Sequence, residues 1–238
     1  TNDASATGIG SIDSSGSVNQ DAGFSIVSYS GIGSAGTIKH GLSTVPKMII
    51  LRRRNTAENW LVYNAKLGAG NYLLLNTTGA SAADTGMWNN TSPTSSVFSV
   101  GSAAGQGASG GTYIAYCFAD TSMSKMGSYT GNANADGTFV YTGFKPAFVM
   151  TKEWEGTSDW YMNDTTRDFN GTSGNDASLL ANTSGAEFTS SSLNVDMLSN
   201  GFKLRSANAS TNEVAGYIYM AFAENPFVTS TGVPATAR

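Results

Sequence analysis

The sequence predicts an all-β protein, an antiparallel β-sandwich of jelly-roll type built from two internal repeats of about 100 residues. Three observations lead to this prediction. Short apolar or alternating runs, separated by Gly, Asn, Ser and Thr clusters typical of turns, recur at roughly the spacing of sandwich strands. No run of ten or more residues shows the 3.6-residue apolar period of a helix. Several strings also return about 100 residues later in the chain.

The returning strings keep the same order in both halves of the chain. The clearest pairs are "SYSG" (28–31) with "SYTG" (128–131), "VPKMIIL" (45–51) with "KPAFVMT" (145–151), "NTTGA" (76–80) with "NTSGA" (182–186), and "YIAYCFAD" (113–120) with "YIYMAFAE" (217–224). Loop insertions and deletions account for the small drift in offset. The order and number of these matches indicate a duplication.

Each repeat reads as a series of short strands. The run "GFSIVSYSG" alternates apolar and polar residues, which is typical of a half-buried strand. The runs "KMIIL" and "AFVMT" are continuously apolar, so we expect strands covered on both faces. The residues that precede Pro46 and Pro146 are restricted to extended conformations, which suits the start of a strand. "NWLVYN", "DWYMND", "YLLLN" and "SLLAN" supply further strands. The last runs, "TYIAYCFA" and "YIYMAFA", are the most apolar, and we expect them in the centre of their sheets.

The repeat boundaries divide the chain into four predicted segments. Residues 1–23 are small, polar and aperiodic, and are expected to form a linker or arm; residues 228–238 form a C-terminal tail. Between them lie the two β-sandwich repeats, 24–120 and 121–227. Two arrangements are open: each repeat forms its own sandwich, or both interleave into one larger sandwich.

Composition and charge argue against several classes of function. The 238 residues include 13 basic and 17 acidic side chains, so the net charge is −4 and there is no broad basic surface for nucleic acid. The densest basic run is Arg52-Arg53-Arg54, at the end of a strand. No apolar run approaches the ~20 residues of a membrane-spanning helix. Cys117, the single cysteine, lies in an apolar strand and is expected to be buried.

No set of residues specifies a reaction, so we predict neither catalytic residues nor a metal or cofactor, and we expect a protein that is not an enzyme. His40 is the one histidine, and we expect a turn residue whose ring bonds the backbone. Glu153 and Glu155 form the one pair of carboxylates that suggests the acid and base of a glycosidase. This pair leaves a polysaccharide depolymerase as an alternative. A solvated strand end is the simpler interpretation of that pair.

Two tryptophans are the candidate binding residues. Trp60 and Trp160 occupy equivalent positions in the repeats, so shared packing explains them. Trp88 and Trp154 have no counterpart and lie in polar, turn-rich surroundings. Exposed aromatic rings in such loops stack on sugars or anchor a partner. We therefore predict that Trp88 and Trp154 bind a ligand or a partner.

A family resemblance is carried by strings spread over residues 24–238. They include "HGLSTVPKMIILRRRN", "PTSSVFSVG", "FVYTGFKPAFVMTK", "LSNGFKLR" and "MAFAENPF". These strings resemble a largely uncharacterised domain of virion proteins from marine bacteriophages, found toward the C-terminal end of tail-fibre and structural proteins of cyanophages and pelagiphages. Such domains often have His after "VY", where this chain has Asn64.

The resemblance implies a structural protein of the virion, a module of a tail fibre, a spike or the capsid decoration, located in the extracellular particle. Its expected partners are other virion proteins or copies of itself, with a host-surface glycan as a further expectation; neither nucleic acid nor membrane insertion is expected. The alternative functions are a carbohydrate-binding module and a bacterial surface or filament subunit. Low charge and many small polar residues suit all of these extracellular roles.

Overall fold

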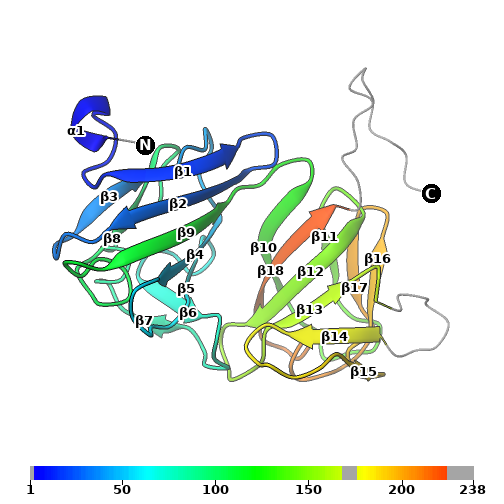
Figure 1. Cartoon of the computed structure of the whole chain (residues 1–238). Helices are drawn as coiled ribbons and strands as arrows, with labels where there is room; N and C mark the ends of the chain where they lie inside the picture. The colour runs from blue at the N-terminus through cyan, green and yellow to red at the C-terminus, as the bar shows by residue number, and fades with distance from the viewer. Residues whose placement is uncertain (1–2, 168–175, 224–238) are drawn as a thin grey trace, which may run out of the picture. The chain divides into compact units, whose positions relative to one another are not determined.

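The chain folds into two compact units, each of which carries its own antiparallel sheets. A computed structural model describes residues 3–167 and 176–223 (Figure 1). Unit 1 comprises Thr1–Asn76 and Ser81–Asp120, and unit 2 comprises Thr77–Ala80 and Thr121–Arg238. The predicted boundary between the repeats therefore coincides with the boundary between the units, apart from the short segment Thr77–Ala80. The all-β fold class predicted from the sequence is confirmed, since the described residues include one helix of four residues, α1 (Ala4–Thr7).

Unit 1 is a sandwich of a seven-stranded sheet and a two-stranded sheet. The large sheet has the order β1-β2-β9-β4-β5-β6-β7 and the small sheet pairs β3 with β8. The strands are β1 (Ser14–Asn19), β2 (Phe24–Ser30), β3 (Gly36–Lys39), β4 (Met48–Arg53), β5 (Leu61–Asn64), β6 (Asn71–Leu74), β7 (Ala82–Ala83), β8 (Val97–Val100) and β9 (Thr112–Phe118).

Unit 2 combines a six-stranded sheet with a three-stranded sheet. Their orders are β10-β18-β12-β13-β14-β15 and β11-β17-β16. The strands are β10 (Ser124–Thr130), β11 (Phe139–Tyr141), β12 (Pro146–Glu153), β13 (Tyr161–Asp164), β14 (Asp176–Leu180), β15 (Phe188–Ser190), β16 (Val195–Leu198), β17 (Gly201–Leu204) and β18 (Gly216–Ala223). The predicted tail, 228–238, lies outside the described residues.

Strand β9 and strand β18 are central in their sheets, as the apolar runs predicted. Strand β9 pairs with both β2 and β4, and β18 pairs with both β10 and β12. The continuous apolar run of β4 is buried along Met48–Leu51, as expected for a strand covered on both faces. The two large sheets share an order of strands. In unit 1 this order is β2-β9-β4-β5-β6, and in unit 2 the corresponding order is β10-β18-β12-β13-β14. A duplication predicts this correspondence, and the duplication itself stays a prediction.

The core of unit 1 lies between its two sheets. Ile38 and Phe98 from the small sheet pack with Tyr29 and Tyr113 from the large sheet in one buried cluster. The alternating pattern of β2 places Val27 and Tyr29 in this core and leaves Ser28 and Ser30 on the opposite face. The core of unit 2 follows the same plan, and there a cluster that includes Phe202 and Tyr217 is buried between its sheets.

The prediction that residues 1–23 form a linker or arm was wrong. Residues 14–19 form β1, which pairs with β2 from Ser14↔Tyr29 to Asn19↔Phe24. Ile12 is buried in the core of unit 1 and forms a parallel bridge with Ile38 of β3. The strand was missed because its residues are small and polar and it exposes most of them, so it lacks apolar alternation.

Candidate functional site

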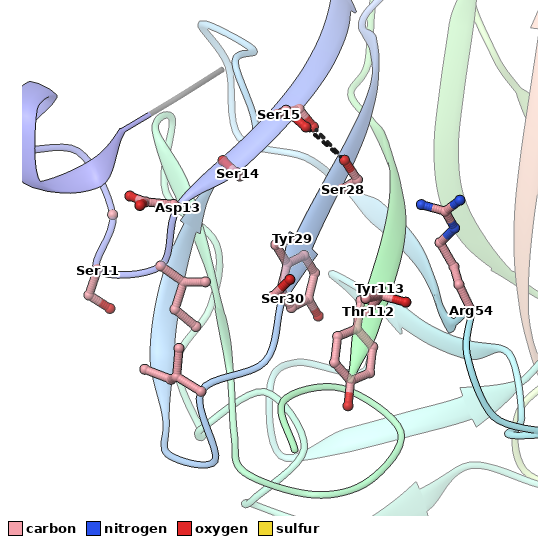
Figure 2. Close-up of a pocket in the computed structure, with 13 residues that line it drawn as sticks. Ser11, Asp13, Ser14, Ser15, Ser28, Tyr29, Ser30, Arg54, Thr112 and Tyr113 are labelled. Atoms are coloured by element: carbon pink, nitrogen blue, oxygen red, sulfur yellow. Dashed lines mark hydrogen bonds between the residues drawn. The ribbon is translucent and has the colours of Figure 1, made fainter. Parts of the chain in front are cut away.

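A pocket opens in unit 1 where β1 parts from β2. The pairing of the two strands begins at Ser14↔Tyr29, and the chain before Ser14 turns away toward β3. There the amide groups of Ser11 and Ile12 both donate to the carbonyl of Thr37, at 2.9 and 3.0 Å. Strand β2 continues along β9 instead. The divergence of the two chains leaves a hollow of about 690 Å³ between them (Figure 2).

Two glycines hold the walls of this pocket in place. Gly10 has a φ of +80°, which side chains rarely adopt, and a Cβ there would lie 3.0 Å from the Thr37 carbonyl oxygen. Gly31, just after β2, approaches the loop before β9 so closely that a Cβ would lie only 2.3 Å from the Ala108 carbonyl oxygen. Residues 10 and 31 must therefore be glycines for the walls of the pocket to keep their positions.

The lining of the pocket is rich in hydroxyl groups. Its residues are Gly10, Ser11, Ile12, Asp13, Ser14, Ser15, Ser28, Tyr29, Ser30, Ile32, Arg54, Thr112 and Tyr113. Figure 2 shows Arg54 at one side of the pocket and Asp13 at the other, with the serines of β1 and β2 between them. Ile32 is half exposed and supplies an apolar surface. The pocket thus offers many hydroxyls, one cation, one carboxylate and a substantial apolar surface.

The hydroxyls on the β1 side of the pocket are tied into the fold. Ser15 and Ser28 face each other across β1 and β2 with their Oγ atoms 2.9 Å apart, and the Ser28 hydroxyl also donates to the Ser15 carbonyl. The Ser14 hydroxyl donates to the Lys39 carbonyl at 3.4 Å, and the Ser11 hydroxyl accepts from the Thr37 amide. These groups are therefore held in fixed positions before any ligand arrives.

The other side of the pocket holds three polar groups that remain available. Ser30 of β2 and Thr112 of β9 are register partners, and the Arg54 amide donates to the Thr112 carbonyl at 2.7 Å. Within residues 3–167 and 176–223, the Ser30 hydroxyl, the Thr112 hydroxyl and the Arg54 guanidinium have no hydrogen-bond or ion-pair partner. Because residues opposite each other on neighbouring strands project on one face, these three groups share a side of the sheet.

The two tyrosines beneath the pocket are fixed by their hydroxyls. The Tyr29 hydroxyl donates to the Gln106 carbonyl at 2.6 Å, and the Tyr113 hydroxyl donates to the Ala104 carbonyl at 2.8 Å while it accepts from the Ala108 amide. Burial raises the pKa of both phenols, so they remain neutral well beyond physiological pH. Their rings lie in the core of unit 1, and their hydrogen bonds fix the ends of β2 and β9 that border the pocket.

The comparison with protein families gives a single assignment. A family model described as a domain of unknown function, DUF7483, matches residues 1–226. The chain belongs to this family. Searches of the curated proteins and of the solved structures found no match.

Trp88 does not have the exposed ring that its surroundings predicted. In this DUF7483 domain its side chain is 1% exposed and packs edge-on against Tyr63, with ring centroids 5.7 Å apart. Its indole nitrogen has no hydrogen-bond partner in the described part of the chain. The prediction of a ligand-binding ring at Trp88 rested on polar neighbours in sequence and is wrong in its premise, because the turn folds the ring inward to the core of unit 1.

Trp154 is half-buried at the end of β12. Its ring covers the backbone of Gly216, where a Cβ would lie 2.2 Å from the ring. The prediction that Trp154 contacts a ligand or partner stays a prediction. The structure does not place either tryptophan in the pocket of unit 1.

The pair Glu153 and Glu155 does not form a solvated strand end. Glu153 is 7% exposed and burial raises the pKa of its carboxyl, whereas Glu155 is exposed and accepts a hydrogen bond from the Gly216 amide at 3.0 Å. Next to them, Lys152 is fully buried and donates to the carbonyls of Thr78 and Gly156. Burial lowers the pKa of Lys152 to about 8. These contacts hold the end of β12 in place within unit 2.

His40 and Cys117 have the structural roles that the sequence predicted. The His40 ring accepts from the Leu42 amide at Nδ1 and lies 3.1 Å from the Thr94 carbonyl at Nε2, so the neutral Nε2–H tautomer satisfies both. Burial lowers the pKa of His40. Cys117 is fully buried, and burial raises the pKa of its thiol to about 12. Its thiol is therefore protonated and inert at neutral pH.

Two further features concern the described residues as a whole. They contain no group of three or more His, Cys, Asp or Glu side chains that could hold a metal ion. They also contain no helix that is long and apolar enough to cross a membrane.

Sequence reasoning missed the pocket because its residues come from four separate segments, and single serines carry no pattern. The one signal was Arg54, at the end of the only dense basic run.

Proposed function

We propose that the chain is a structural module of a bacteriophage virion, part of a tail fibre, a spike or the capsid decoration, and that it contributes to assembly and to attachment to the host surface. The family resemblance of its dispersed strings supports the location in the virion. The observation that carries the attachment role is the hydroxyl-lined pocket of unit 1, where the side chains of Ser30, Arg54 and Thr112 have no partner among residues 3–167 and 176–223.

The character of the two units supports a role in binding rather than in chemistry. Three of the buried ionisable groups are engaged by the fold: His40 by backbone groups, Lys152 by two carbonyls, and Tyr29 by one carbonyl. Three side chains without a partner in the described part of the chain, those of Ser30, Arg54 and Thr112, lie at one preformed pocket. A rigid, all-β framework that presents such a pocket suits recognition without a large conformational change.

Unit 2 offers a surface for neighbouring proteins in the particle. Strand β11 pairs with β17 alone among the described strands, and two of its three side chains, Phe139 and Tyr141, are exposed on one face. A strand edge with exposed aromatic rings is a common place for another chain to bind. Other virion proteins or further copies of this chain are the partners that we propose.

Competition for host adsorption tests the attachment role. The purified chain is added in excess to host cells before the phage, and free phage is counted over time. We expect the chain to slow adsorption in a dose-dependent way, because it occupies the same surface receptors. An equal dose of heat-unfolded chain is the control. Unchanged adsorption at saturating chain would contradict the attachment role.

The alternative functions are less well supported. A carbohydrate-binding module built on the tryptophans is disfavoured because Trp88 is buried in the core of unit 1. A bacterial surface or filament subunit would share this fold, and it would be found on cells rather than in particles.

A further inference from the structure

We propose that the pocket of unit 1 binds an acidic saccharide, with the acidic group of the sugar at Arg54, Ser30 and Thr112 and its hydroxyl groups along the serines of β1 and β2. This inference rests on the proposed function, because it names the ligand class of the attachment site. The ligand chemistry follows from the arrangement of the charged and hydroxyl groups around one hollow.

The side chains of Arg54, Ser30 and Thr112 determine where the acidic end of the ligand binds. The guanidinium of Arg54 presents a fork of N–H donors that matches a carboxylate or a sulfate. Ser30 and Thr112 lie on neighbouring strands on the same side of the sheet and add two hydroxyl donors. Arg52 and Arg53 are engaged elsewhere: Arg52 donates to the Glu58 carbonyl and stacks on Trp60, and Arg53 donates to Asn55.

The orientation of the ligand follows from Asp13. This carboxylate lies at the side of the pocket opposite Arg54 (Figure 2). It accepts hydrogen bonds from sugar hydroxyls and repels a second anion, so the ligand carries its charge at the Arg54 end. Like charges that meet in a binding site repel each other, and this repulsion favours one orientation over its reverse.

The body of the ligand meets hydroxyls that are already positioned. Ser15 and Ser28 are bonded to each other, and each hydroxyl retains capacity for a further hydrogen bond. Ile32 offers an apolar surface to a ring face, and the volume of about 690 Å³ accommodates a short oligosaccharide. Because the serines are fixed before binding, little side-chain entropy is lost when the ligand is bound.

Titration of the full chain with three matched oligosaccharide sets tests this proposal. The probes are uronic-acid oligomers, sulfated galactan oligomers and neutral gluco-oligosaccharides of equal length, with binding followed by calorimetry and by ligand-observed NMR. We expect at least one acidic set to bind. The affinity for the neutral set should be lower than for that acidic set by about tenfold or more. The two acidic sets distinguish carboxylate from sulfate as the recognised group.

Variants locate the site. Arg54→Gln should weaken binding of the acidic set by about ten- to hundred-fold, because a hydrogen bond to a charged group is lost. Thr112→Val, which keeps the shape of the side chain, should weaken it by a few-fold. Lys66→Gln removes one positive charge from an exposed position outside the pocket and should leave affinity unchanged. Circular dichroism of each variant establishes that it is folded.

Three results would overturn the proposal: no binding of any acidic set by the wild-type chain, equal affinity for acidic and neutral sets, or unchanged affinity in folded Arg54→Gln. Failure here is distinguishable from failure of the proposed function. If competition for adsorption succeeds while every saccharide set fails, the attachment role stands and the ligand class falls. If saccharides bind while adsorption is unaffected, the pocket stands and the attachment role falls.

Discussion

Tyr29 and Tyr113 stack in the core of unit 1 with ring centroids 5.1 Å apart and an interplanar angle of 17°. In unit 2, Tyr129 and Tyr217 stack at 4.9 Å and 9°. The second member of each pair donates to a carbonyl and accepts from an amide in the loop before its strand. The two units thus fasten a long loop to the large sheet in the same way.

Removal of the first hydroxyl of each pair should destabilise its unit. Tyr29→Phe leaves the Gln106 carbonyl without its buried donor, and Tyr129→Phe does the same to the Thr211 carbonyl. We expect each substitution to lower the free energy of unfolding by about 1–3 kcal/mol. Urea denaturation followed by fluorescence measures the loss. Tyr141→Phe, at an exposed hydroxyl, is the control, and an equal effect there would contradict this account.

Trp88 should matter for stability and not for ligand binding. Trp88→Ala removes a fully buried ring from the core of unit 1 and should lower the free energy of unfolding by about 3–5 kcal/mol. Trp88→Phe keeps most of the apolar volume and removes an indole N–H that has no partner in the described residues, so we expect a much smaller loss. Thermal unfolding compares the two. A stable Trp88→Ala chain that has lost saccharide binding would contradict the burial of this ring.

His40 should make stability depend on pH in the weakly acidic range. Burial lowers the pKa of the folded-state imidazole below its ordinary 6.5, so the unfolded chain binds the proton first as pH falls. The contribution is fully present above about pH 6.5 and is lost as pH falls below it, by at most about 1.4 kcal/mol per pH unit. Urea unfolding at pH 7.5, 6.0 and 5.0 measures this slope. His40→Gln should flatten it, and an identical slope in the variant would exclude His40 as its source.

Gly31 should not tolerate a methyl group. An added Cβ would lie 2.3 Å from the Ala108 carbonyl oxygen, so the backbone on one wall of the pocket must shift. We expect Gly31→Ala to lower the free energy of unfolding by about 1–3 kcal/mol and to weaken binding in the pocket. Gly70→Ala is the matched control, because the nearest atom to its Cβ is 3.6 Å away. Equal melting temperatures for the two variants would contradict the close approach.

The sequence indicated the strands that carry long apolar runs, and missed shorter or more polar strands such as β1, β3 and β8. Strand β9 was predicted as central because its apolar character is strong, and it is central. Strand β1 was missed because its pairing depends on backbone hydrogen bonds, which leave no mark on residue type. The same limit applies to Trp88, since polar neighbours in sequence do not reveal which way a turn directs a ring.

The candidate site was beyond sequence reasoning for a related reason. Ser30 and Thr112 are 82 positions apart and meet only through the register of β2 with β9. Arg54 joins them because β4 pairs with the other edge of β9. Each residue alone is ordinary, and the chemistry arises from the sheet topology that gathers them.

The location of the chain in purified particles tests the central claim most directly. Phage particles are banded by density, their proteins are quantified by mass spectrometry, and the chain is located on intact particles with gold-labelled antibody. We predict a fixed copy number per particle and gold at the tail or on the capsid surface. Particles that infect normally and contain none of this chain would contradict the account.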